Sequence, residues 1–196
     1  TESQLGMVSA FYFMPVAILA IIIGRALDKY SVKNFMLIGS VIYAIGLFSL
    51  SFINSYWSLL TIYLTILALG SIMMGNLAVA KLISNWFDKN AGRALGIAAV
   101  GISFSGVVLP LVVDPLLDLV GWRNVYVIFA SVILFIILPL IFFTVIDDPK
   151  TINQVKDGIK KDIEETIPQE MTAKDLLSKK VFWIISLAFA FQFLSM

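Results

Sequence analysis

The chain has 196 residues, of which 60% are hydrophobic and only 14% are charged. Soluble domains carry about 25% charged residues and at most about 50% apolar ones, so this composition excludes an ordinary soluble protein and indicates a membrane protein. The sequence contains no cysteine and no histidine. Disulfides, thiolate metal sites and the commonest general base are therefore excluded. We predict no catalytic residues, no metal site, no cofactor and no nucleic-acid partner, so the protein is not expected to be an enzyme.

Five apolar runs are long enough to cross a bilayer, whose core of about 30 Å needs about 20 helical residues. A sixth run begins near the end of the chain. The charged residues lie between these runs or at their ends, and no run shows the polar face of a helix in a soluble bundle. We therefore predict an all-α, multi-pass transmembrane helical bundle. The runs are 5–24, 35–53, 57–80, 94–113, 125–146 and the segment from residue 181.

Positive charge is concentrated on one side of these predicted spans. The connections 25–34, 81–93 and 147–180 contain every Lys and Arg except Arg123, which lies in the connection 114–124 on the other side. Positive residues stay on the cytoplasmic side of a membrane, so we expect the first group of connections to face inward.

The predicted organisation is five transmembrane helices in 1–146, a cytoplasmic central loop in 147–180, and the start of a further helix in 181–196. The chain starts at Thr1 rather than Met and stops inside an apolar run. We therefore expect it to be a fragment of a longer protein.

The inner turn after the first run carries a distinctive charge pattern. Gly24 is followed by Asp28 and Lys29, and then by Lys33. The acid lies at the C-terminal end of a predicted helix, where the helix dipole disfavours an anion, so it needs a basic partner. This turn resembles the signature between the second and third helices of the major facilitator superfamily, with Ser31 standing where glycine is usual.

The resemblance implies a transporter of two six-helix halves that rock about a central site. This chain would supply helices 2 to 6 of the N-terminal half and the start of helix 7. In the family, the acid of the signature contacts the opposite half and a nearby basic residue, and so latches the inner gate shut. Arg93 and Lys81 are the candidate partners here. The gating motif implied by the resemblance comprises Gly24, Asp28, Lys29, Lys33 and Arg93.

The segment 85–97 resembles one branch of the family. An aromatic pair, Trp86 and Phe87, is followed by Arg93, Gly96 and Ile97, as in the same loop of monocarboxylate and oxalate/formate carriers. The resemblance implies a secondary carrier of a small organic anion such as a monocarboxylate. It would work by symport or antiport, with a proton or a counter-anion. A non-transporting receptor or scaffold on the same fold is the alternative.

The expected location is the cytoplasmic (inner) membrane of a prokaryote. The expected partners are the transported small molecule, the lipid bilayer and the missing C-terminal half of the same chain.

The run 94–113 is rich in small residues, which allow helices to approach closely in lipid. They form two nearly opposite stripes, which predicts close packing on two sides. In the family the corresponding helix lies between the two halves, so a sliding interface and ordinary static packing are both open. The helix-packing residues are Gly92, Gly96, Gly101, Ser103, Gly106 and Pro110.

Charged side chains inside a membrane would mark an ion path, and none lies within the predicted spans. The remaining candidates for contact with a substrate are uncharged polar residues at membrane depth: Tyr63, Asn76 and Gln192. Each has two possible partners, a solute or a neighbouring helix. In the organic-anion branch, the cationic residues that pair with the substrate lie mainly in the half that is missing here.

Overall fold

The computed structural model describes residues 2–152 and 156. The run from residue 181 and Gln192 lie outside these residues. The described part contains helices and no strand, which confirms the all-α prediction. The helices are α1 Glu2–Lys29, α2 Val32–Leu50, α3 Tyr56–Ile62, α4 Ala68–Met74, α5 Asn76–Trp86, α6 Ala91–Val132 and α7 Leu138–Thr144, with the π-helical turns η1 Tyr63–Leu67 and η2 Ile133–Ile137 and the 3-10 turn η3 Pro149–Ile152.

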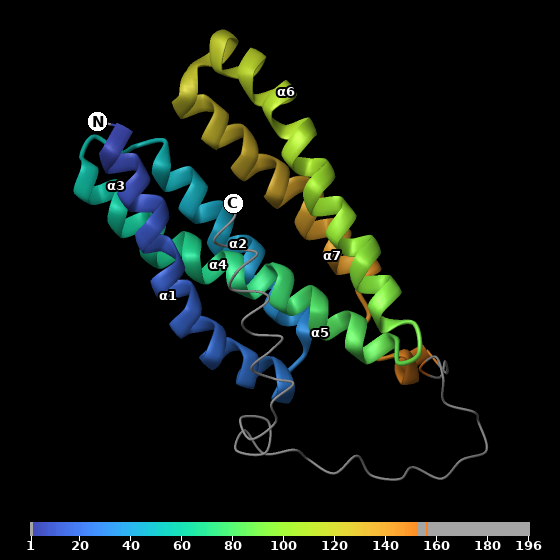
Figure 1. Ribbon diagram of the computed structural model, residues 1–196. Helices are drawn as coiled ribbons and strands as arrows, with labels where there is room; N and C mark the ends of the chain where they lie inside the picture. Colours follow the sequence, from blue (N-terminus) through green and yellow to red (C-terminus); the bar gives the residue numbers. More distant parts are fainter. Residues whose placement is uncertain (1, 153–155, 157–196) are drawn as a thin grey trace, which may run out of the picture. The chain divides into compact units, whose positions relative to one another are not determined.

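Three helical segments of the described residues are long and apolar enough to cross a membrane. They are Val32–Leu50 with 19 residues, Tyr56–Trp86 with 31 and Ala91–Thr144 with 54. The longest one folds back on itself, so that its second arm returns alongside the first (Figure 1). The five predicted runs are helical, except that 35–53 and 125–146 extend slightly past the ends of α2 and α7 and that 57–80 is interrupted at Gly75.

The reversal within α6 occurs at Gly121, which has φ 75° and ψ 159°. Glycine adopts a positive φ at little cost, because it has no Cβ. The chain thus reverses at one residue within the predicted connection 114–124, and helix continues on both sides of it. Pro115 lies inside the helix. Its ring fixes φ near the helical value, and Asp114 and Asp118 remain exposed at the surface.

The turn between α1 and α2 explains the unusual Ser31. Its side chain accepts a hydrogen bond from the backbone N–H of Asn34 at 3.1 Å, and so caps the start of α2. Serine is among the best residues for this position, since its oxygen satisfies an otherwise unpaired helical donor. Val32, the first residue of α2, is almost completely buried.

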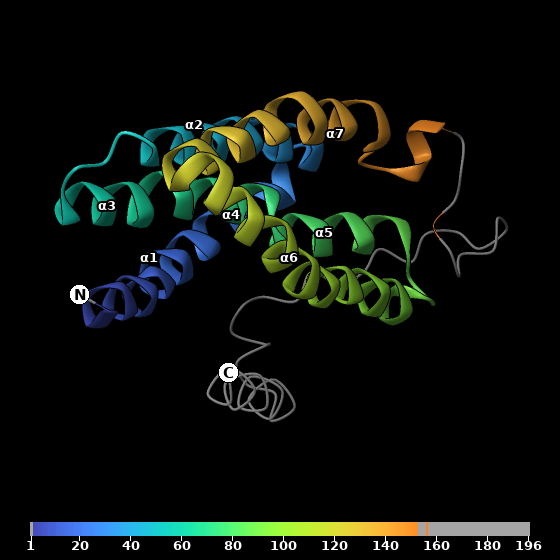
Figure 2. The same cartoon turned by 90° about the horizontal axis from the view of Figure 1, so that it is seen from above.

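The closest helix packing lies between α2 and α4, around two glycines. A Cβ built on Gly39 would come within 2.6 Å of the Met73 Cβ, and one built on Gly70 within 2.7 Å of the Tyr43 backbone nitrogen. Both positions require glycine, since real Cβ atoms do not approach this closely. α2 also contacts α7, so it makes contacts with two other spans (Figure 2).

The segment Tyr56–Trp86 is interrupted at Gly75. This residue is extended, with φ −88° and ψ −152°, and it separates α4 from α5. A Cβ there would collide with the carbonyl oxygen of Ser71, so the break also depends on glycine. By contrast, α1 and α6 continue through Pro15 and Pro110. The interruption of a span therefore lies at a glycine and not at a proline.

Candidate functional site

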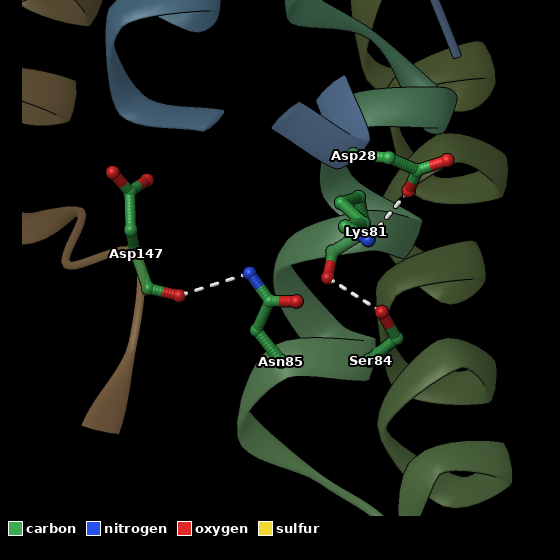
Figure 3. A network of polar contacts seen from close by, with 5 residues as sticks. All are labelled: Asp28, Lys81, Ser84, Asn85 and Asp147. Carbon is green, nitrogen blue, oxygen red and sulfur yellow. Dashed lines mark hydrogen bonds and ion pairs between the residues drawn. The ribbon is translucent and has the colours of Figure 1, made fainter. Parts of the chain in front are cut away.

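An ion pair lies at the signature turn. The Nζ of Lys81, on α5, lies 2.6 Å from Oδ1 of Asp28, in the last turn of α1 (Figure 3). The side chains of Asp28 and Lys81 are 65% and 31% exposed. Lys81 is thus the partner of Asp28 in this part of the chain. The other candidate, Arg93, is exposed at the start of α6 and makes no ion pair with any residue that the structure describes.

A second set of contacts, the inner clasp, joins the ends of α2, α5 and α7. Oδ1 of Asp147 accepts the backbone N–H of Lys33 at 2.6 Å. The backbone oxygen of Asp147 accepts a hydrogen bond from the side-chain amide of Asn85 at 3.1 Å (Figure 3). Nε1 of Trp86 donates to the backbone oxygen of Ile146 at 2.7 Å. A carboxylate at a helix N-terminus is favourable, because the unpaired N–H groups there carry partial positive charge.

Sequence reasoning missed Asp147. It is 114 residues from Lys33 along the chain, and an acid that follows an apolar run resembles any loop residue. The one available signal was that α2 begins without an acid in its first turn. Of the other motif residues, Lys33 places its Nζ 5.0 Å from the centre of the Phe142 ring, and Lys29 is exposed.

At the opposite end of the helices, Arg123 forms an outer clasp. Its guanidinium donates to the backbone oxygen of Ile53 at 3.2 Å and to Oδ1 of Asn54 at 3.1 Å. It also lies over the Trp122 ring, 4.2 Å from the centre. The connections 25–34 and 81–93 therefore lie at one end of the helices, together with Asp147, the first residue of the connection 147–180. The single basic residue assigned to the other side lies at the other end.

At membrane depth, polar and aromatic side chains from α1, η1 and α4 form a chain of contacts. The Tyr63 ring meets the Tyr12 ring edge-on, with centres 5.2 Å apart. The hydroxyl oxygens of Tyr12 and Ser71 lie 2.6 Å apart. Since Ser71 donates its proton to the backbone oxygen of Ala68 at 2.9 Å, Tyr12 is the donor in the contact with Ser71.

Next to this chain of contacts is a pocket of about 590 Å³, the middle pocket, between α1, α4 and α5. Asn76, the residue after the Gly75 break, lines it. Two of the three predicted substrate candidates, Tyr63 and Asn76, are thus connected through Tyr12, Ser71 and this pocket. The lining residues are Val16, Ala20, Ser71, Ile72, Gly75, Asn76, Leu77 and Ala80.

A further pocket of about 260 Å³, the inner pocket, lies beside the ion pair. It shares Leu77 and Ala80 with the middle pocket, so the two form one groove between α1 and α5. The lining residues are Gly24, Leu27, Asp28, Leu77, Ala80, Lys81 and Ser84. The groove leads from Asn76 to Asp28 and Lys81.

The small residues of α6 lie on open faces. A Cβ built on Gly92, Gly96, Gly101 or Gly106 would meet no described atom within 4 Å. Ser103 and Pro110 are exposed as well. Nothing among the described residues packs on these positions, so the predicted close packing stays a prediction.

The sequence profile of the Major Facilitator Superfamily matches residues 1–196. The chain belongs to the major facilitator superfamily. This family confirms the prediction of a multi-pass membrane protein, and it agrees with helices as the only regular elements of the described part.

Curated relatives within the superfamily are fungal transporters. MFS-type transporter 1 of Ophiocordyceps sp. (strain BCC 1869) is 31% identical over 118 residues, which cover 60% of this chain and 26% of the relative. The Fujikurins efflux protein of Gibberella fujikuroi is 30% identical over 101 residues, covering 52% of this chain and 22% of the relative. The riboflavin transporter MCH5 of Saccharomyces cerevisiae is 26% identical over 112 residues, covering 56% and 21%.

The match thus spans about a quarter of the length of these superfamily members. No solved structure matches the chain. The relatives give no support to the monocarboxylate branch or to a prokaryotic membrane, since their names mention neither and their organisms are fungi.

Proposed function

We propose that the complete protein is a secondary carrier of a small organic anion, such as a monocarboxylate, and that this chain supplies most of its N-terminal half. The observation that carries the proposal is the ion pair between Asp28 and Lys81 in the family's signature turn. Its position at the end of the groove between α1 and α5 is where an inner gate of an alternating-access carrier would close.

The ion pair joins two helices of the same half, so it does not by itself close a gate between halves. Its proposed role is to hold the Asp28 carboxylate in place, with its second oxygen free to meet the opposite half. Gly24, Lys29 and Arg93 complete the proposed gating surface. Lys33 instead binds α2 to α7 through Asp147 and Phe142.

The open faces of α6 are proposed to meet the second half. Exposed glycines in a membrane helix favour close approach to another helix, and none of the described residues occupies that place. The charge on an organic anion would be met by the second half as well, because none of the residues that line the middle pocket is charged.

The orientation that goes with this function places the inner clasp and residues 147–180 in the cytoplasm. All Lys and Arg residues except Arg123 belong to that side in the sequence. A proton or a counter-anion is proposed as the coupling partner. Catalysis is not part of the proposal.

The test is uptake into liposomes that contain the complete protein. Labelled lactate and oxalate are the anionic solutes. Riboflavin is included because the relative from Saccharomyces cerevisiae is named as its transporter. We expect saturable lactate uptake, which an inward proton gradient or internal lactate accelerates. Protein-free liposomes are the control.

Two results would contradict the proposal in different ways. Saturable uptake of riboflavin, without uptake of lactate or oxalate, would mean that the substrate is a neutral solute and not an organic anion. Saturable binding of lactate without flux would favour the alternative of a receptor or scaffold on the same fold.

A further inference from the structure

The break at Gly75 places irregular backbone in the middle of an apolar span of 31 residues. The lipid core offers no hydrogen bonds, so non-helical backbone at this depth is tolerated only where it is buried in protein or lines a watery cavity. The break lines the middle pocket. Irregular backbone on the wall of the middle pocket is therefore compatible with polar contents there.

Asn76 is the second sign of a polar occupant. Its side chain is exposed, and among residues 2–152 and 156 nothing hydrogen-bonds to it. A carboxamide offers two donors and an acceptor with two lone pairs, and leaving them unpaired in an apolar surrounding is unfavourable. Ser71, by contrast, already donates to Ala68 and accepts from Tyr12, which leaves it one acceptor site.

The lining of the middle pocket sets the chemistry of what it can hold. The pocket contains no charged residue. Apart from Ser71 and Asn76, it is lined by aliphatic side chains and glycine. An ion here would lose its hydration without gaining a counter-charge, whereas a neutral group would find the amide of Asn76 and the hydroxyl of Ser71. The volume of about 590 Å³ lies within the range of small-molecule sites, about 300–1,000 Å³.

We infer that the middle pocket binds an uncharged, hydrogen-bonding part of the transported solute, with Asn76 as the main contact. The inference rests on the proposed carrier function and adds a solute class to it: the solute has an apolar body and a neutral polar group, such as a hydroxyl or an amide. The groove between α1 and α5 is its path toward the ion pair of Asp28 and Lys81. Any charge on the solute is met outside this pocket.

The experiment measures which reagents reach the pocket in the complete protein, so it does not depend on knowing the solute. This chain has no cysteine, and any cysteine elsewhere is replaced by serine. The variant Asn76→Cys is treated with three methanethiosulfonates that carry a hydroxyethyl, an aminoethyl or a sulfonatoethyl group, which are neutral, cationic and anionic. Rates are normalised to Ser84→Cys, at the exposed end of the groove. Thr65→Cys is the matched control, since Thr65 is exposed on the same span but bonds its own helix at Thr61.

We expect the neutral reagent to modify Asn76→Cys about tenfold faster than either charged one, because burial of a charge in an uncharged pocket is costly. Thr65→Cys should react slowly with all three. A fastest reaction with the anionic reagent would make the pocket an anion site and overturn the inference. So would absence of reaction at Asn76→Cys while Ser84→Cys reacts. If Asn76→Cys does not fold, Ala80→Cys, which lines the same pocket, takes its place.

A kinetic readout links the pocket to transport. In the uptake assay, Asn76→Leu should raise KM about five- to tenfold and change kcat little, as expected for the loss of a hydrogen bond made equally throughout the cycle. Thr65→Val should leave both unchanged. An unchanged KM in Asn76→Leu would overturn the inference and leave the carrier function intact. If the neutral reagent reacts fastest at Asn76→Cys but lactate is not taken up, the proposal of an organic-anion carrier is contradicted. The inference that the middle pocket binds a neutral group then still stands.

Discussion

Removing the carboxylate of Asp28 should shift the complete transporter toward its inward-open state. The variant Asp28→Asn keeps the shape of the side chain but loses the ion pair with Lys81 and any contact with the opposite half. Lys81→Met removes the ion pair alone. Lys89→Met is the matched control, because Lys89 is exposed in the connection 81–93, lies outside the gating motif, and makes no ion pair among the described residues.

The size of the shift follows from the exposure of the pair. The N–O distance of 2.6 Å is short, but the two side chains are 65% and 31% exposed. An exposed pair is worth about 0.2–1 kcal/mol, because water and ions screen it, which corresponds to a change of about 1.4- to 5-fold in a two-state ratio. We therefore expect Lys81→Met to shift the ratio by no more than this amount. Asp28→Asn should shift it further if the acid also contacts the opposite half.

The populations of the inward-open and inward-closed states can be measured by double electron–electron resonance between two spin labels. One spin label at Tyr30, which is exposed in the inner turn, is paired with one on the inner end of the second half. The double variant of Asp28→Asn and Lys81→Met should behave like Asp28→Asn alone, because the two residues share one contact. Distance distributions of Asp28→Asn that match wild type would refute the latch. A larger shift in Lys81→Met than in Asp28→Asn would refute the role of Lys81 as support for the acid.

Three further outcomes are expected. Gly70→Ala should destabilise the protein by about 1–3 kcal/mol, seen as a lower Tm in detergent, because the new methyl group meets the backbone of α2. Gly96→Ala should leave Tm unchanged, since no described atom lies within 4 Å of a Cβ built there. Equal effects of the two variants would contradict the packing described. Asp147→Ala should destabilise the protein by about 1–3 kcal/mol, seen as a lower Tm, because it leaves a helix donor without its charged acceptor, and Asp118→Ala should leave Tm unchanged. An unchanged Tm in Asp147→Ala would contradict the role of the inner clasp. Lys150→Cys and Asp118→Cys should react with an impermeant thiol reagent from opposite sides of the membrane, the first from the cytoplasm, and labelling of both from one side would overturn the orientation.

The sequence predicted the helices and the need for a partner at Asp28, because both depend on local physics. Apolar runs of about 20 residues have few alternatives to a membrane helix. An acid at a helix C-terminus is unfavourable wherever it occurs, and Lys81 was one of two bases within reach. These features require no knowledge of how distant segments meet.

Close contacts between distant segments were beyond sequence reasoning. The pattern of small residues directed attention to α6, yet the tight approach lies at Gly39 and Gly70. The sequence shows glycine in α6 as well as at Gly39 and Gly70. Only the atoms that face each glycine tell whether a Cβ would fit there. The same holds for Gly75, whose neighbouring carbonyl excludes a Cβ, and for Gly121, whose positive φ reverses the chain within the predicted connection 114–124.

The positions of the two clasps divide α2 to α7 into a frame and an arm. The inner clasp holds the ends of α2, α5 and α7 together, and the outer clasp ties Arg123 to the loop after α2. Three spans are thus fastened at both membrane surfaces, so a torque applied at one surface is transmitted to the other as a rigid rotation. The first arm of α6 is fastened to them mainly through the loop at 87–90 and the single reversing residue Gly121. We therefore expect a force from a neighbouring helix to move this arm before it moves the frame.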